Sequence, residues 1–215
     1  MELKVYFDYK SPFAYLAMEP AFALPRRYDV AIRFLPYVLR IKGPGQRSIY
    51  SDWKARYSYL DARRWANRRG GFVIRGPKKV YDSAPSLIGG LFAQREGFFE
   101  RYSLEVFRRF FEHRLEIDEG EAVAAVIGEL GHDAAAYRDF LAGDGPKLLD
   151  ASVEEGHADH VFGVPMFIVA GEPFWGHDRI PLLEERLTEL GLARRPAADA
   201  QRGEAERSPL GWENQ

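Results

Sequence analysis

The chain has 215 residues, 46% of them apolar, and a formal net charge of −2 at pH 7. This length suits one elaborated domain or two small ones, and the near-neutral charge gives no reason to expect nucleic acid or an anionic membrane as a partner. There is no cysteine, which excludes disulfides, thiolate zinc sites and a redox dithiol, so any sulfur chemistry must use a thiol from outside.

The first third of the chain predicts a strand–helix–strand unit. Residues 3–8 alternate apolar side chains and form the first strand, residues 12–27 form a helix, and residues 30–35 form the second strand. Pro20 and Pro25 predict a kink or an early stop in the helix. A unit of this length favours parallel strands with a right-handed crossover.

Ser11 lies where the first strand turns into the first helix. Serine is a good N-cap, and Pro12 then occupies the first helical position, where its missing N–H costs nothing. The free N–H groups and the positive dipole end of a helix favour an anion or a thiolate at this place. The alternative is that Ser11 only caps the helix.

The middle of the chain is helical. We expect a helix over residues 51–70, followed by helices over 84–96, 98–113, 119–130, 134–141 and 147–160. Four aromatic residues of the first of these helices are expected mainly in the core, although the wall of an acceptor pocket is the alternative; they are Trp53, Tyr57, Tyr59 and Trp65.

The last third returns to strands. A strand begins at Pro165, a turn follows at residues 170–173, a short strand covers residues 174–176, and a helix covers residues 181–190. This is the thioredoxin order with a helical insertion, an α/β fold. We expect a thioredoxin-like domain of residues 1–38 and 160–192, a helical insert of residues 39–159, and a disordered tail of residues 193–215.

Two stretches carry a resemblance to a known family. They are Asp8-Tyr9-Lys10-Ser11-Pro12-Phe13-Ala14-Tyr15-Leu16, and Phe162-Gly163-Val164-Pro165-Met166-Phe167 followed by Phe174-Trp175-Gly176-His177-Asp178-Arg179. Together they resemble the 2-hydroxychromene-2-carboxylate isomerase family, a relative of kappa-class glutathione transferases and of DsbA-type oxidoreductases. Residues 57–66 agree with the insert helix of that family.

The resemblance implies a glutathione-binding thioredoxin fold that forms a homodimer, with Ser11 facing the glutathione sulfur. The family's cis-proline motif falls on Val164-Pro165, whose backbone would pair with the cysteinyl backbone of glutathione. The turn His177-Asp178-Arg179 would place Asp178 at the γ-glutamyl ammonium group. Lys54 aligns with a lysine that meets the glycyl carboxylate, but the asparagine that often assists is replaced by Gly45-Gln46.

The chemistry of a bound thiol agrees with this role for Ser11. A free thiol, with a pKa of about 8.5, is only a few per cent thiolate at neutral pH. A helix N-terminus and a hydroxyl donor would lower that pKa. Serine without a nearby base is a poor nucleophile, so we expect Ser11 to donate a hydrogen bond to the thiolate and not to attack.

The expected function is glutathione-dependent isomerisation of an unsaturated hydroxy or keto acid derived from an aromatic ring. The alternatives are a glutathione transferase acting on other electrophiles and a non-catalytic binding module. The chain opens without a basic and apolar leader and has no apolar run of about 18 residues, so we expect a cytoplasmic location. His157 and His160 are three residues apart, but we interpret them as a solvated helix end and expect no metal.

Overall fold

The structure, a computed structural model, describes residues 1–39 and 49–194. Gly45-Gln46 and residues 195–215 of the predicted tail lie outside the described residues. The first two residues of that tail are paired, because Ala193 bridges Tyr28 and the Arg194 N–H donates to the Arg27 carbonyl.

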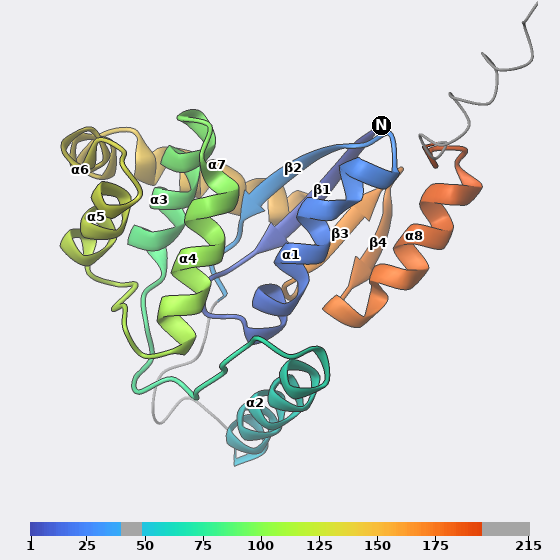
Figure 1. The fold of residues 1–215 in the computed structure, drawn as a ribbon, viewed down its shortest axis with the longest axis horizontal. Coiled ribbons are helices and arrows are strands. Elements are labelled where there is room, and N and C mark those ends of the chain that lie inside the picture. The colour runs from blue at the N-terminus through green and yellow to red at the C-terminus, as the bar shows by residue number, and fades with distance from the viewer. Residues whose placement is uncertain (40–48, 195–215) are drawn as a thin grey trace, which may run out of the picture.

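Four strands form one sheet in the order β2-β1-β3-β4 (Figure 1). They are β1 (Glu2–Phe7), β2 (Ala31–Pro36), β3 (Met166–Val169) and β4 (Glu172–Trp175). β1 pairs parallel with β2 and antiparallel with β3, and β4 pairs antiparallel with β3. The parallel pair needs a crossover, which α1 (Pro12–Arg27) provides.

The helices fall close to the predicted ranges. They are α2 (Ile49–Arg69), α3 (Ala84–Arg95), α4 (Phe99–Phe111), α5 (Gly120–Glu129), α6 (Ala134–Ala142) and α7 (Gly145–Ala158), and then, after the sheet, the 3-10 turn η1 (His177–Arg179) and α8 (Ile180–Glu189). The predicted thioredoxin order with helices between its halves is confirmed. No helix within residues 1–39 and 49–194 is long and apolar enough to span a bilayer.

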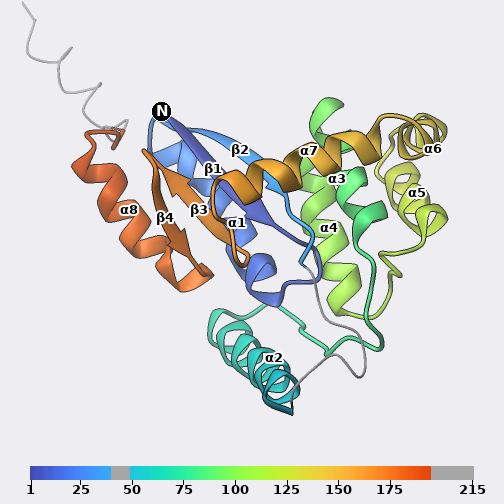
Figure 2. The ribbon, with the colours of Figure 1, turned by 180° about the vertical axis from the view of Figure 1, so that it is seen from behind.

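The two faces of the sheet are covered by different helices. α1 and α8 lie on one face (Figure 1), and α7 crosses the other (Figure 2). Strand alternation explains the division: Leu3, Val5 and Phe7 point to the face of α1, while Tyr6 belongs to a smaller cluster with Val164 on the face of α7. The larger cluster continues without a break from β1 and α1 into α3, α4, α5 and α6.

α1 has the predicted range. Of the kink or early stop expected from its prolines, the early stop does not occur, because the helix runs through Pro20 and Pro25 to Arg27. The proline at position 20 has no N–H for the carbonyl oxygen of Leu16, and the guanidinium of Arg69, from α2, donates to that oxygen instead.

The expectation for the aromatic residues of α2 holds only in part. Tyr59 and Trp65 are partly buried and pack against the core, but the other two do not. Trp53 and Tyr57 are each 58% exposed, so they do not belong to the core. Ala62 and Ala66 are the most deeply buried of the α2 side chains that the structure describes. Figure 1 shows α2 below α1, away from the other helices.

Candidate active site

The turn between β1 and α1 presents Ser11 as predicted. The Ser11 N–H donates to the Asp8 carbonyl oxygen at 2.9 Å, which closes the turn at the end of the strand. The Ser11 Oγ accepts the N–H of Ala14 at 3.1 Å, so the N-cap prediction is confirmed. Ser11 is 5% exposed. The N-terminus of α1 is therefore capped by a buried hydroxyl group.

That hydroxyl also joins the two ends of the chain. Ser11 Oγ donates to the carbonyl oxygen of Val164 at 3.1 Å, and the peptide bond from Val164 to Pro165 is cis. The two stretches that carry the family resemblance thus meet at one hydrogen bond. The Ser11 proton is held by the Val164 carbonyl, so the hydroxyl must turn away from that oxygen before it can donate to a ligand.

A cavity of about 250 Å³ opens beside this bond. Its walls come from α1, α2, η1, β4 and the loop before β3, and they are Phe13, Asp61, Trp65, Val164, Pro165, Trp175, Gly176, His177, Asp178 and Arg179. Four of the predicted site residues line it together: Val164, Pro165, His177 and Asp178. Ser11 lies one hydrogen bond behind the wall, at Val164.

Lys54 is not part of this wall. It is exposed on α2, seven residues before Asp61. Seven residues make about two helical turns, which place Lys54 on the same side of α2 as Asp61 but about 10 Å further along the axis. The predicted partner region at Gly45-Gln46 lies outside the described residues.

Gly176 allows the turn that carries Asp178. Its φ is 114°, a conformation that favours glycine, and a Cβ at this position would come within 2.5 Å of Asp178 Oδ1. The Gly176 N–H donates to the Pro165 carbonyl at 3.0 Å. The Asp178 carboxylate pairs with Arg179 at 2.7 Å, and both side chains are more than a third exposed. The turn therefore presents a carboxylate at the mouth of the cavity.

The ring of His177 is clamped between two aromatic side chains. Phe13 stacks on it with centroids 5.2 Å apart and an interplanar angle of 15°, and Trp65 meets it edge-on at 4.9 Å. The Nε2 atom is buried and has no hydrogen-bond partner among the described residues. Burial lowers the pKa of His177 from its usual value, against the opposing effect of the Asp178 carboxylate. The imidazole is therefore neutral at neutral pH.

Two features of the site escaped the sequence analysis. Asp61 was not expected at the cavity, although it lies four residues before Trp65, for which a pocket wall was the alternative to the core. Asp8 and Lys10 form a buried ion pair at 3.5 Å. This pair holds both backbone groups of Leu39: Asp8 Oδ2 accepts its N–H at 2.8 Å, and Lys10 Nζ donates to its carbonyl at 3.1 Å. In the sequence, the only sign of this ion pair is two opposite charges that lie two residues apart after a buried strand.

The basic residues of α2 have local partners. Arg64 lies 3.8 Å from Asp61, Arg69 pairs with Glu19 at 3.0 Å, and the guanidinium of Arg68 lies over the ring of Trp65. Within residues 1–39 and 49–194, no group of three or more acidic or histidine side chains could hold a metal ion.

Comparison with known proteins gives both a family and close relatives. The family model of the DSBA-like thioredoxin domain matches residues 2–188. The 2-hydroxychromene-2-carboxylate isomerase of Pseudomonas putida is 30% identical over 200 residues, which cover 88% of this chain and 96% of that protein. The isomerase of the same name from Sphingobium xenophagum is 27% identical over 196 residues, covering 86% and 96%.

Solved structures agree with these relatives. The structure of a 2-hydroxychromene-2-carboxylate isomerase matches with a TM-score of 0.75 and 29% identity, over 97% of this chain and all of that one. The cytosolic disulfide reductase DsbM from Pseudomonas aeruginosa matches with a TM-score of 0.60 and 16% identity, over 81% of this chain and 88% of that one, which shows a shared fold alone.

Proposed function

The chain belongs to the DsbA-like thioredoxin family and, within it, to the 2-hydroxychromene-2-carboxylate isomerases, and from this membership we propose that it is a glutathione-dependent isomerase. The substrate class is an unsaturated hydroxy or keto acid derived from an aromatic ring. One observation carries the proposal: the buried Ser11 hydroxyl meets Val164 beside a cavity with carboxylates in its wall, in a chain that has no cysteine of its own.

The residues around the cavity fit glutathione. Asp61 and Asp178 offer two carboxylates for an ammonium group, and the γ-glutamyl end of glutathione carries one. The backbone of Val164 lies at the cavity wall, where a peptide could pair with it as an added strand. Lys54, which lies further along α2 on the side of Asp61, would meet the glycyl carboxylate, as the family resemblance implies.

Glutathione would supply a thiolate, whose addition to an unsaturated carbon turns the double bond into a single bond that can rotate, and whose departure re-forms the double bond. The residues of this chain would stabilise that sulfur in its ionised form. Ser11 would turn its hydroxyl from the Val164 carbonyl to the thiolate, while its Oγ keeps the N–H of Ala14 and so keeps the helix capped. The N-terminus of α1 adds a positive dipole end, which favours the ionised form of the thiol.

Two further parts of the proposal concern the protein in the cell. We expect it to form a homodimer, as the family resemblance implies, and to work in the cytoplasm. Sedimentation analysis of the full chain tests the first expectation, and fractionation of the source cells tests the second.

The experiment that tests the function combines binding with turnover. Calorimetry should show binding of reduced glutathione, and conversion of 2-hydroxychromene-2-carboxylate should require it. Conversion without added thiol, or glutathione binding without conversion, would contradict the isomerase. Turnover of other electrophiles alone would favour the transferase, and weak binding without any turnover would favour the binding module.

A further inference from the structure

The proposed chemistry gives no task to the His177 ring, a polar group in the wall of the cavity. Its Nε2 atom is buried and unpartnered among the described residues, although buried nitrogen atoms in native proteins nearly always have a partner. A ring that served only as packing could be replaced by Phe without this cost. The unpartnered nitrogen therefore points to a ligand, or to a water that the ligand replaces.

Two aromatic contacts fix the position of the His177 ring. Phe13 covers one face of His177 from α1, and Trp65 presses on it from α2. The ring cannot swing out to solvent without separating these contacts. It therefore forms a fixed part of the cavity wall, held in place by Phe13, which lies two residues after Ser11.

The charges that face the ring are nearly balanced. Asp61 and Arg69 act on it from α2, and Asp178 and Arg179 act on it from η1. Both carboxylates are cavity residues to which the proposed function assigns an ammonium group. A ligand ammonium held between them would bring a positive charge beside His177. A protonated imidazole would repel that charge, whereas a neutral ring nitrogen could accept a hydrogen bond from it.

We propose that the His177 imidazole is a recognition group for the ligand's ammonium, that it works only as the neutral ring, and that ligand capture is therefore lost on acidification. The proposal rests on the proposed function, because that function puts an ammonium in this cavity. The site would take small peptides or amino acids with a free α-ammonium group. By linkage, binding would displace a proton from any His177 that is protonated, and the proton would pass to the buffer.

Burial sets the pH range of the effect. It lowers the pKa of His177, so the loss of affinity should begin below the usual histidine value of about 6.5. Well below its pKa, a group that must be neutral for binding costs about tenfold in affinity for each pH unit.

The test is calorimetry with S-methylglutathione, whose blocked thiol removes the sulfur and Ser11 from the pH response. We expect the affinity of the wild-type chain to fall from pH 7 toward pH 5, with a slope that approaches tenfold for each pH unit once the pH is well below the pKa of His177. Buffers with different ionisation enthalpies should report proton release on binding near the lower pH. His177→Asn and His177→Phe should bind more weakly at pH 7 and show no pH slope. The Phe variant keeps an aromatic ring between Phe13 and Trp65.

The control is His160→Asn. His160 is exposed outside this cavity and has a φ of 57°, which asparagine tolerates, so this variant should keep the wild-type slope. A flat wild-type response, or a slope that persists in both folded His177 variants, overturns the inference and leaves the proposed function standing. Failure of glutathione and its S-methyl form to bind at any pH overturns both.

Discussion

Ser11 makes two hydrogen bonds with one oxygen, and they serve different purposes. As an acceptor from Ala14 it caps α1, and as a donor to Val164 it holds the loop before β3. Any role toward a thiolate uses the second bond and leaves the first in place. The stability effect and the chemical effect of this residue can therefore be separated by measurement.

The first prediction concerns Ser11→Ala. Loss of the cap should lower the free energy of unfolding by about 1 kcal/mol, which urea titration measures. The pKa of bound glutathione thiol should rise, because the thiolate loses a donor, and ultraviolet absorbance of the thiolate at varied pH measures it. Ser11→Thr keeps the hydroxyl and is the matched control. A mutant with an unchanged thiol pKa would remove Ser11 from the chemistry and leave it as a cap.

The sequence allowed prediction of part of this site. The positions of Ser11, Val164 and Asp178 follow from local rules and from the resemblance, since each lies at a turn whose shape a few residues determine. Asp61 could not be placed, and Trp65 was left between the core and a pocket wall, because helix periodicity says which residues share a face but not what that face meets. Trp53 shows the same gap, since it was expected in the core and is exposed.

At the scale of elements, α1 depends on α2 for one of its own hydrogen bonds. Pro20 lacks the N–H that would donate to the Leu16 carbonyl in a regular helix, and the guanidinium of Arg69, from α2, donates to that oxygen instead. Residue patterns within α1 cannot reveal a partner that lies about fifty positions away in the sequence. This is why Pro20 predicted a break that the helix does not have.

The second prediction is a double-mutant cycle on this bond. Arg69→Met should lower the free energy of unfolding by about 1–3 kcal/mol, because the buried Leu16 carbonyl loses its donor. In a Pro20→Ala background the helix supplies its own N–H, so the same change should cost about 1 kcal/mol less. Arg63→Met, at an exposed position of α2, should cost almost nothing. Equal losses in both backgrounds would show that Arg69 does not substitute for the missing N–H.

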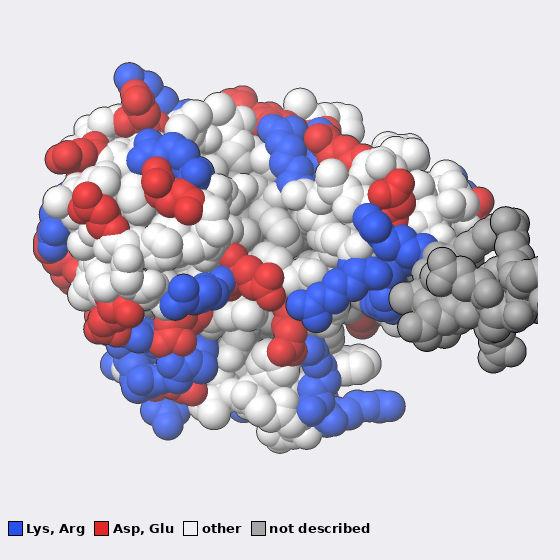
Figure 3. All heavy atoms as spheres, turned by 45° about the horizontal axis from the view of Figure 1, so that its top comes forward, with Lys and Arg blue, Asp and Glu red and all other residues white. Residues whose placement is uncertain are grey.

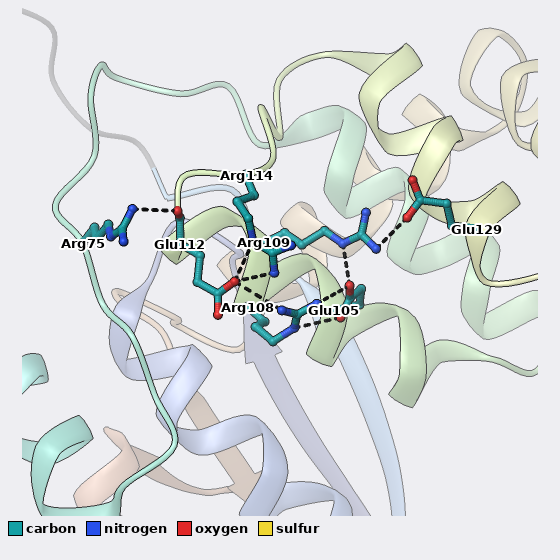
Figure 4. Close-up of polar contacts among 7 residues, drawn as sticks. All are labelled: Arg75, Glu105, Arg108, Arg109, Glu112, Arg114 and Glu129. Carbon is teal, nitrogen blue, oxygen red and sulfur yellow. Dashed lines mark hydrogen bonds and ion pairs between the residues drawn. The ribbon is translucent and has the colours of Figure 1, made fainter.

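A network of charges joins α4 to its neighbours (Figure 4). Glu105 accepts hydrogen bonds from Arg108 and Arg109, and Arg109 also reaches Glu129 of α5 at 2.7 Å. Burial alone would raise the pKa of Glu105, but the two arginines outweigh it and lower that pKa. Arg109 is thus the charged link between two helices of the insert.

The third prediction is that Arg109→Met lowers the free energy of unfolding by about 1 kcal/mol at low salt, and by less at high salt, because partly exposed ion pairs are screened. Arg101→Met on the exposed side of α4 is the control and should show little change. Unfolding curves at two salt concentrations measure both. A loss that does not depend on salt would mean that packing of the arginine stem matters more than its charge.

At the scale of the molecule, the fold order could be predicted because it follows from the sequence of strand and helix patterns and from the handedness of the crossover. The contacts that hold the two ends of the chain together could not be predicted, because they join residues over 100 positions apart. Figure 3 shows acidic and basic side chains next to one another over most of one face, as suits a net charge near zero.

The main polar contact between the two ends of the chain is a group of five charged or polar side chains between β1, β2 and the end of α7. Lys4 lies 2.7 Å from Asp159 and 3.0 Å from Glu155, Arg33 pairs with Glu155, and the Tyr6 hydroxyl donates to Asp159 at 2.5 Å. Burial opposes ionisation of both acids, but their partners prevail, and the pKa values of Glu155 and Asp159 are lowered.

A lowered folded-state pKa fixes the sign of the pH dependence. The stabilisation from Glu155 and Asp159 is fully present above their unfolded-state pKa values of about 4, and it is lost as the pH falls through the lower folded-state values. Both side chains are about a quarter exposed, which reduces the energy of each pair but does not remove it.

The last prediction follows for Lys4→Met, which removes the cation shared by the two acids. At neutral pH the free energy of unfolding should fall by about 1 kcal/mol, and the difference from wild type should shrink as the pH falls below about 4, because the two acids become protonated as the pH passes through their lowered folded-state pKa values. Urea titrations across this range measure it. Lys147→Met removes an exposed lysine that lies 3.5 Å from Asp144. This variant should lose unfolding free energy at acidic pH in the same way as the wild type. A constant difference between Lys4→Met and wild type down to pH 3 would mean that Lys4 stabilises the fold by packing its stem against the sheet, and that the two ends of the chain are held together by the apolar core alone.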